Sequence, residues 1–369
     1  MKKLWKQILD EIAPYEPGKP IEEVKRELGL DKVIKLASNE SPYGPSEKVL
    51  EAIMEAAKSA NRYPDGGCFY LRKALSKKLS ISGEKIVFGN GSDELIILAL
   101  RAFVHPGEEI IISDPTFLVY KIASRIVGAD VVTVPVKDFK YDLEAIAERI
   151  TPQTKMIFIA NPENPTGTYI SGDELKRFIE KVPKDVVVFI DEAYYEFAVG
   201  GDYPETIDLI EREDKNIIVS RTFSKAYGLA GLRLGYIMAR KDLAEAVNKV
   251  REPFNINSVA QAAAITALDD TESVNSSIKL TKEEKEKLYK AFDKLDIKYI
   301  PSRTNFILID TKRDSKKVFD YMLRSGIIIR EMSAWALEGF VRVNMGLPEE
   351  NEEFLRVFTE ALEKIPIKR

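Results

Sequence analysis

Residues 221–235 form the part of the sequence best suited to covalent chemistry. Lys225 lies there among small and apolar residues, and burial in such surroundings lowers the pKa of a lysine and makes its amine nucleophilic. Thr222, Ser224 and Arg233 stand nearby and could bind a phosphate with two hydroxyls and a planar cation. An isolated lysine usually lies on a solvated surface, but a polar cluster within an apolar, glycine-rich segment favours a functional interpretation.

Two more turns with chemically useful side chains follow apolar runs. Asp191 comes directly after the run at residues 186–190, where a carboxylate loses solvation and needs a cationic partner. That partner could be a nearby Lys or Arg, or a protonated ring nitrogen. In the turn at residues 161–167, two prolines and a glycine present Asn164 rigidly. A purely structural turn explains the prolines and the glycine, but explains two asparagines less well.

A glycine turn at residues 89–94 leads from another apolar run into a predicted helix. The free backbone N–H groups and the dipole of a helix N-terminus suit a phosphate. Taken alone, the simpler interpretation is an ordinary strand-to-helix turn with Ser92 or Asp93 as the N-cap. The turn matches neither a Walker A loop nor a G-x-G-x-x-G motif.

These turns together offer a phosphate cradle, an Asn/Tyr pair, a buried acid and a buried amine. Pyridoxal 5'-phosphate is the cofactor that needs all four. Its aldehyde needs a lysine, its ring nitrogen an acid, its 3-oxygen hydrogen-bond donors, and its phosphate a cradle. Ligands of open α/β sheets bind outside the carboxyl ends of the strands, which is where these residues are predicted to meet.

The sheet that must position these residues is predicted from residue 85 to residue 240. Short apolar runs alternate there with helix-like segments, and the runs are nearly unbroken and rich in β-branched residues. The pattern predicts an α/β fold whose large domain has a mostly parallel seven-stranded sheet covered by helices. The predicted strands are residues 85–89, 109–113, 130–134, 155–160, 186–190, 216–220 and 234–239.

A smaller α+β domain is predicted for residues 258–369, where long helical stretches separate short strand-like runs. The N-terminal segment, residues 1–40, has no sheet pattern of its own and is expected to pack on this domain, which leaves residues 41–257 as the large cofactor-binding domain. The strand-like runs of the smaller domain are residues 305–309, 326–330 and 340–343.

Two pairs of residues have the spacing of a capping box and so predict helix starts. Ser171 and Glu174 form one pair, and Thr281 and Glu284 form the other.

The composition excludes several classes of function. The chain has 369 residues with 55 Lys and Arg against 59 Asp and Glu, so it carries no electrostatic footprint for nucleic acid. His105 and Cys68 are the only histidine and cysteine, which excludes a disulfide framework and a zinc site with several such ligands. We therefore expect no metal. With no signal-like segment and no apolar stretch of about 20 residues, a cytoplasmic enzyme without membrane contact is expected.

Nearly end to end, the sequence resembles the fold-type-I pyridoxal-phosphate aminotransferases, most closely their histidinol-phosphate branch. The lysine segment RTFSKAYGLAGLRLGY marks the superfamily, while PYEPGKP and PFNINSVAQ are more specific to that branch. Other matching motifs are KLASNESPYGPS, RYPDG, GNGSDELI, NPENPTG, DEAYYEF and GFVRVNMGLPEENEEF.

The resemblance implies a role for each matching residue toward the cofactor. Lys225 would form the Schiff base and act as general acid and base, and Asp191 would pair with the pyridinium nitrogen. Asn164 and Tyr194 would bond the 3-oxygen of the cofactor. The residues expected to hold the phosphate or ring are Gly91, Ser92, Asp93, Phe117, Thr222, Ser224, Arg233 and, from the other subunit of a homodimer with shared sites, Tyr63. Many relatives have tyrosine in place of Phe117.

Substrate binding is implied for a second group of residues. Arg342 and Arg330 would hold the phosphate of histidinol phosphate, and the same two arginines would hold the carboxylate of glutamate. Tyr15 and Asn164 would complete this subsite. Glu163 and Ser41 stand where many relatives have asparagine, and Glu163 is expected to add a negative charge near an anion-binding site.

The implied activity is reversible amino transfer between histidinol phosphate and 2-oxoglutarate through a pyridoxal-phosphate Schiff base, in histidine biosynthesis. The alternatives in the same fold are an aromatic amino-acid aminotransferase and a threonine-phosphate decarboxylase. A third alternative, from a different class, is a non-enzymatic regulator that binds pyridoxal phosphate. Such regulators carry an appended DNA-binding domain, whereas here the predicted domains account for all 369 residues.

Overall fold

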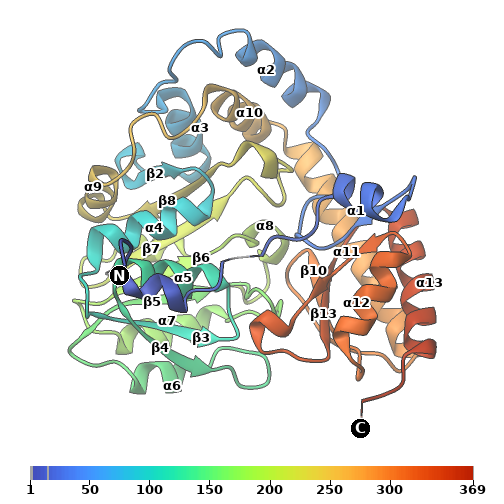
Figure 1. Ribbon diagram of the computed structural model, residues 1–369. Coiled ribbons are helices and arrows are strands. Elements are labelled where there is room, and N and C mark those ends of the chain that lie inside the picture. The colour runs from blue at the N-terminus through green and yellow to red at the C-terminus, as the bar shows by residue number, and fades with distance from the viewer. Residues whose placement is uncertain (1–2, 15, 369) are drawn as a thin grey trace.

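A seven-stranded sheet forms the centre of the larger part of the molecule in the computed structural model, which describes residues 3–14 and 16–368 (Figure 1). The strands lie in the order β2-β8-β7-β6-β5-β3-β4, and β8 alone runs antiparallel to its neighbours. The mostly parallel sheet predicted from the sequence is therefore confirmed. Its strands are β2 (Ile86–Gly89), β3 (Glu109–Asp114), β4 (Asp130–Pro135), β5 (Thr154–Ala160), β6 (Val187–Asp191), β7 (Asn216–Thr222) and β8 (Gly235–Ala239).

The central strands are apolar along their whole length because both faces of the sheet are covered. In β5, Ile157 and Ile159 point into one core, while Met156 and Phe158 point into the core on the other face. Burial of each such side chain stabilises the fold by about 2 kcal/mol. One face is covered by α4 (Ser92–Phe103), α5 (Leu118–Val127) and α9 (Lys241–Lys249), and the other by α2 (Glu47–Ala57), α3 (Phe69–Leu79), α6 (Leu143–Glu148), α7 (Gly172–Lys181) and α10 (Ser258–Asp269).

The second part of the molecule is built on an antiparallel sheet of order β12-β13-β10-β9. Three helices and the apolar faces of the strands enclose its core. Two predicted runs are β10 and β13, the run at 326–330 divides into β11 and β12, and β9 was not predicted. The elements are β9 (Lys298–Ile300), β10 (Phe306–Asp310), β11 (Ile327–Ile328), β12 (Arg330–Glu331), β13 (Phe340–Asn344), α11 (Thr271–Lys294), α12 (Ser315–Arg324) and α13 (Pro348–Lys364).

One of the two predicted helix starts is correct. Ser171 caps α7, because its hydroxyl accepts from the Glu174 N–H while its own N–H donates to the Glu174 carboxylate at 2.8 Å. The prediction at Thr281 is wrong, since α11 continues through that position and buries Thr281 and Glu284. The Glu284 carboxylate accepts from the amide of Asn351 instead. The same three-residue spacing therefore occurs both at a helix start and on the buried face of a helix interior, so the spacing alone does not identify a cap.

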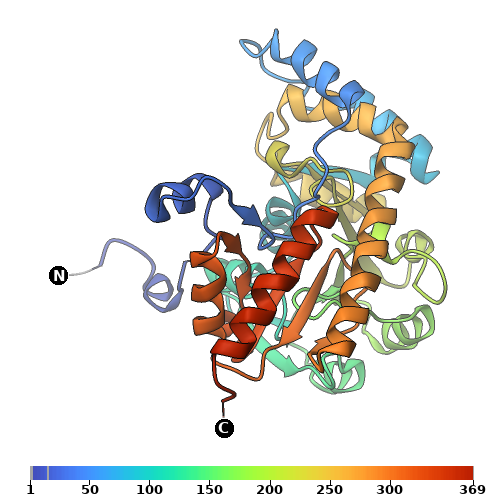
Figure 2. The same cartoon turned by 90° about the vertical axis from the view of Figure 1, so that its right-hand side faces the viewer.

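The N-terminal segment contacts both parts of the molecule. Figure 2 shows this segment at the left edge of the molecule. Its strand β1 (Ile34–Lys35) pairs in parallel with β11, and α1 (Ile21–Leu28) packs beside that pair. The short helix η1 (Gln7–Glu11) lies against α5 of the larger part. The remaining short helices are η2 (Gly83–Lys85), α8 (Tyr195–Ala198), η3 (Ile207–Glu211), η4 (Ala230–Leu232) and η5 (Ser333–Trp335).

The domain boundaries after residues 40 and 257 stay predictions. Helix α10 follows the second boundary, yet it packs on α2 and α3 and shares the core on their face of the large sheet. This packing favours a boundary at the end of α10, near Asp269, over one at its start.

Candidate active site

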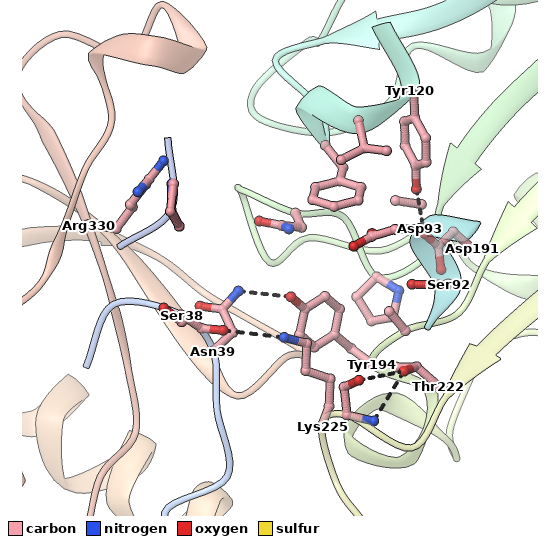
Figure 3. Close-up of a pocket in the computed structure, with 18 of the residues that line it drawn as sticks. Ser38, Asn39, Ser92, Asp93, Tyr120, Asp191, Tyr194, Thr222, Lys225 and Arg330 are labelled. Carbon is pink, nitrogen blue, oxygen red and sulfur yellow. Dashed lines mark hydrogen bonds between the residues drawn. The ribbon is translucent and has the colours of Figure 1, made fainter. Parts of the chain in front are cut away.

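A cavity of about 500 Å³ lies where the carboxyl ends of the sheet strands face the second part of the molecule (Figure 3). Parallel strands end at one edge of a sheet, so residues far apart in the sequence meet there. The lining includes the following residues predicted from the sequence: Ser92, Asp93, Phe117, Asn164, Asp191, Tyr194, Thr222, Ser224, Lys225, Arg233, Arg330 and Arg342.

Lys225 lies in the loop after β7, with its side chain pointing into this cavity (Figure 3). Its Nζ donates to the carbonyl oxygen of Ser38 at 3.3 Å and lies 5.8 Å from the centre of the Tyr194 ring. Burial, and then the positive charge of Arg342, lower the pKa of Lys225 to about 8. About a tenth of this amine is therefore uncharged at pH 7, far more than of an ordinary lysine, and the uncharged form is the nucleophile.

Asp191 ends β6 and is only 4% exposed. One carboxylate oxygen, Oδ2, accepts from the hydroxyl of Tyr120 at 2.7 Å. The other, Oδ1, is buried and has no hydrogen-bond partner among the residues that the structure describes. Burial raises the pKa of Asp191 to about 6. No Lys or Arg in the described part of the chain forms an ion pair with Asp191, so the unpaired oxygen fits a protonated nitrogen of a bound ring.

The N-terminus of α4 and the loop after β7 form a cradle suited to a phosphate. Ser224 N–H donates to the Thr222 hydroxyl at 3.1 Å, and the Arg233 guanidinium approaches the Asp93 carboxylate at 3.4 Å. Gly91 has φ +80°, and a Cβ there would lie 2.5 Å from Nη2 of Arg233. The structure places Gly91 as the N-cap of α4, so neither predicted side chain caps this helix and the prediction of Ser92 or Asp93 as N-cap is wrong.

Two arginines enter the cavity from the second part of the molecule. Arg342 donates to the amide oxygen of Asn164 and, at 3.3 Å, to the carbonyl of Ala37. With the Asn164 oxygen engaged in this way, the NH₂ group of that amide is left as a donor. Arg330 donates to the carbonyl of Glu16 at 2.7 Å, and both guanidinium groups lie within 6 Å of the Trp335 ring. With Arg233 from the larger part, the cavity thus combines an amine, an acid and three planar cations.

Three predicted residues are not part of the lining. Gly91 lies just behind it, against Arg233. Tyr63 is 84% exposed and stacks on Phe254, with ring centres 4.8 Å apart, so its contribution to the site of another subunit stays a prediction. Tyr15 lies outside the described residues.

Three residues of the site were missed in the sequence. Asn39 donates from Nδ2 to the hydroxyl of Tyr194 at 2.8 Å, and its own N–H donates to Oδ1 of Asn344 at 3.0 Å. Ser38 bonds Lys225, and Tyr120 bonds Asp191. The motif KLASNESPYGPS and the helical spacing of Phe117 and Tyr120 were signals, but neither shows which side chain a residue contacts.

Glu163, expected from the sequence to add a negative charge near the anion-binding site, lies where burial disfavours that charge. Its side chain is 0% exposed, and in the described residues it has no ion-pair partner. Burial raises its pKa well above the ordinary value, although the nearby hydroxyls of Tyr141 and Thr116 oppose that shift. Burial therefore favours the uncharged form of Glu163, which reduces the negative potential expected at the neighbouring phosphate cradle.

Glu163→Gln should stabilise the protein increasingly as the pH rises. A carboxyl with a raised pKa in the folded state contributes stability below its unfolded pKa and loses it as the pH rises through the folded pKa. Glutamine keeps the shape of the protonated acid and does not titrate. We expect a gain in Tm of about 2 °C at pH 8 and almost none at pH 4.5, measured by thermal denaturation. Glu148→Gln, at an exposed position of α6, is the control, and an equal gain at both pH values would contradict a buried neutral acid.

The described residues contain no cluster of His, Cys, Asp and Glu that could hold a metal ion. Within the same part of the chain, every helix is too short or too polar to cross a membrane.

Comparison with known proteins identifies the family of this chain. A family model described as aminotransferase class I and II matches residues 31–358. The chain is 44% identical to histidinol-phosphate aminotransferases from Moorella thermoacetica, over 95% of this chain and 91% of that protein, and from Caldicellulosiruptor saccharolyticus, over 97% and 100%. It is also similar to the crystal structure of histidinol-phosphate aminotransferase from Sinorhizobium meliloti in complex with pyridoxal 5'-phosphate, with a TM-score of 0.90, 27% identity and 98% of each chain covered.

Proposed function

This chain belongs to the aminotransferase class I and II family, and from that premise we propose that it transfers an amino group reversibly between histidinol phosphate and 2-oxoglutarate, in histidine biosynthesis, with pyridoxal 5'-phosphate as cofactor. Relatives with this activity in their names align with almost the whole chain. The observation that carries the proposal is that Lys225 and the unpaired oxygen of Asp191 belong to one cavity, together with a phosphate cradle.

The residues around the cavity fit this cofactor group by group. Lys225 would bind its aldehyde, Asp191 would hold the proton on the ring nitrogen, and Phe117 would stack on the ring. Asn164 and Tyr194 would donate to the 3-oxygen. The phosphate would be bound by Gly91, Ser92, Asp93, Thr222, Ser224 and Arg233. When bound, pyridoxal phosphate supplies an aldehyde for the substrate amine and a ring that withdraws electrons from its α-carbon.

Lys225 is also suited to move the proton at the substrate carbon. Because its pKa is lowered to about 8, the amine can accept a proton near neutral pH and return it at the next step. Asn39 fixes the hydroxyl of Tyr194, whose ring lies beside the amine. These contacts hold the base in one place before a substrate binds.

The substrate anion would bind at Arg330 and Arg342. A guanidinium binds phosphate and carboxylate with the same two-pronged geometry, so one pair of arginines can serve histidinol phosphate and glutamate in turn. Both guanidinium groups lie within 6 Å of the Trp335 ring, and this cation–π contact stabilises their position. Tyr15 belongs to this proposed subsite by resemblance alone.

We also propose a homodimer with shared sites, located in the cytoplasm. Large apolar side chains are exposed together on and beside α2 and α3, which is unusual for a monomer's surface. They are Leu50, Met54, Tyr63, Phe69, Tyr70 and Phe254. A second copy packed on this face would cover them and would bring Tyr63 to its partner's phosphate cradle.

Mixing two inactive variants tests whether the sites are shared. If Tyr63 serves the partner's site, a mixed dimer of Lys225→Ala and Tyr63→Ala has one doubly altered site and one intact site. Activity should then rise from near zero to about a quarter of the wild-type value after exchange of subunits, because half of the dimers are mixed. No recovery would contradict sharing, and so would a single-subunit mass at micromolar concentration.

The activity itself is tested by titrating the visible spectrum of the cofactor-loaded enzyme with histidinol phosphate and with phenylalanine. We expect histidinol phosphate to remove the lysine–cofactor band and to have the higher kcat/KM. A preference for phenylalanine would favour the aromatic amino-acid aminotransferase. Release of carbon dioxide from threonine phosphate would favour the decarboxylase.

A further inference from the structure

A second and larger cavity, of about 870 Å³, lies between α8, α11 and the loop at residues 300–303. It shares no lining residue with the candidate active site. Its walls come from both parts of the molecule, with Tyr169 on the side of the large sheet and Arg303 on the other. A ligand in this cavity would therefore contact both parts at once.

Four cationic side chains line this cavity, and they lack acidic partners. Unlike many lysines and arginines of this chain, these four have no carboxylate within 4.0 Å in the described part of the protein. The four are Lys140, Lys282, Lys285 and Arg303. Cations gathered around a concave surface without counter-charges produce a positive potential that favours an anion.

Lys285 is the buried member of the group, only 8% exposed. Its Nζ donates to the carbonyl oxygens of Ser302 at 2.7 Å and Thr304 at 2.6 Å, which leaves its charge without a counter-ion. Burial, and then the charge of Arg303, lower the pKa of Lys285 to about 7, with a smaller contribution from Lys282 and against the opposing charge of Glu286. An anion beside Nζ would neutralise the charge of the Lys285 ammonium group and would therefore favour the protonated amine.

Arg303 is fixed beside this lysine. Its N–H donates to the carbonyl of Gly167 at 2.8 Å, and its guanidinium lies 4.9 Å from the centre of the Tyr169 ring. The Tyr169 hydroxyl in turn donates to Asp202. A guanidinium held by an aromatic face and by its own backbone is oriented in advance for a planar or tetrahedral oxyanion.

The acidic residues of the cavity do not cancel this charge. Asp138 and Glu286 are exposed. Burial raises the pKa of Glu196 to about 7, so it is partly neutral near physiological pH. Both exposed carboxylates keep their water shells, and salt screens their effect on the buried end of the cavity.

From these contacts we propose that the cavity binds a small oxyanion, a phosphate or a carboxylate on a low-molecular-weight metabolite, between Lys285 and Arg303. The rings of Tyr169 and Tyr289 line the same space and would contact the body of such a ligand. This site is independent of the proposed amino transfer.

The test measures protection of Lys285 in the cofactor-loaded enzyme. The protein is labelled briefly with an amine reagent at increasing concentrations of inorganic phosphate or of acetate, and the labelling of each lysine is read by mass spectrometry. We expect phosphate to protect Lys285, and Arg303→Ala to weaken this protection about tenfold, since a charged hydrogen-bonding partner is lost. Protection by acetate as well would identify the site as a general oxyanion site, whereas protection by phosphate alone would restrict it to phosphates.

Two control variants make the result specific. Lys290→Ala removes an exposed charge from the same helix without touching this cavity and should leave protection unchanged. Arg342→Ala removes the anion-binding arginine of the candidate active site and should also leave it unchanged. Absence of protection by either anion would overturn the proposal, and so would protection lost in Arg342→Ala but kept in Arg303→Ala.

Discussion

Lys225→Ala should lower kcat for amino transfer by about 10⁴-fold or more, because it removes both the attachment point of the cofactor and the base that moves the substrate proton. Such a loss corresponds to about 5.5 kcal/mol in the transition state. The variant should keep its fold, since the lysine is only partly buried and donates one hydrogen bond, at 3.3 Å, to Ser38. Steady-state kinetics and the visible spectrum of the loaded protein measure the two effects.

The controls for this variant separate chemistry from folding. Lys241→Ala, at an exposed lysine of α9, should change neither the rate nor the spectrum. A small primary amine added to Lys225→Ala should restore part of the rate, because it can enter the space that the side chain leaves and accept the proton. Full activity in Lys225→Ala, together with an unchanged lysine–cofactor band, would refute the role given to this residue.

Asp191→Asn should lower kcat by about 10³-fold while the fold is kept. Asparagine has the same shape but no charge, so it cannot hold a proton on the nitrogen of a bound ring, and one electrostatic contact of this kind contributes roughly 10²–10³-fold. Tyr120 would still donate to the amide oxygen, as it does to Oδ2 at 2.7 Å in the present structure. The effect should therefore come from the lost charge and not from a displaced side chain.

Tyr120→Phe is the matched variant for this prediction. It removes the hydrogen bond to Asp191 but leaves the charge, so its loss of rate should be much smaller than that of Asp191→Asn. The same pair of variants should show the same order in cofactor affinity, measured by equilibrium dialysis. If Asp191→Asn retained wild-type kcat, the ring nitrogen would not need this acid.

The large sheet could be predicted because its strands are buried on both faces. Runs such as residues 156–160 and 186–190 have no polar residue, and parallel strands with that property pack between two layers of helices. Once the strand order is right, the carboxyl ends must bring Asp191 and Lys225 to one edge. Most of the candidate site could therefore be predicted from the rule that parallel strands end at the same edge of a sheet.

The contacts that could not be predicted depend on long-range pairing. Asn39 meets Asn344 across 305 positions of sequence, and no local pattern records that contact. The strand β9 has three residues and too little alternation to be recognised. Thr281 has the spacing of a cap, but tertiary burial of α11 overrides that local signal. Tyr63 is a different case, because its proposed partner belongs to another molecule.

Residues 37–39 pass between the two parts of the molecule, and this affects when the site can form during translation of the protein. These residues touch Lys225, Tyr194 and Arg342, yet β1 just before them is held by β11, almost 300 positions later in the chain. A growing polypeptide therefore cannot assemble a working catalytic centre until nearly all of it has left the ribosome. Prematurely terminated chains would lack the contacts of residues 37–39 that complete this site.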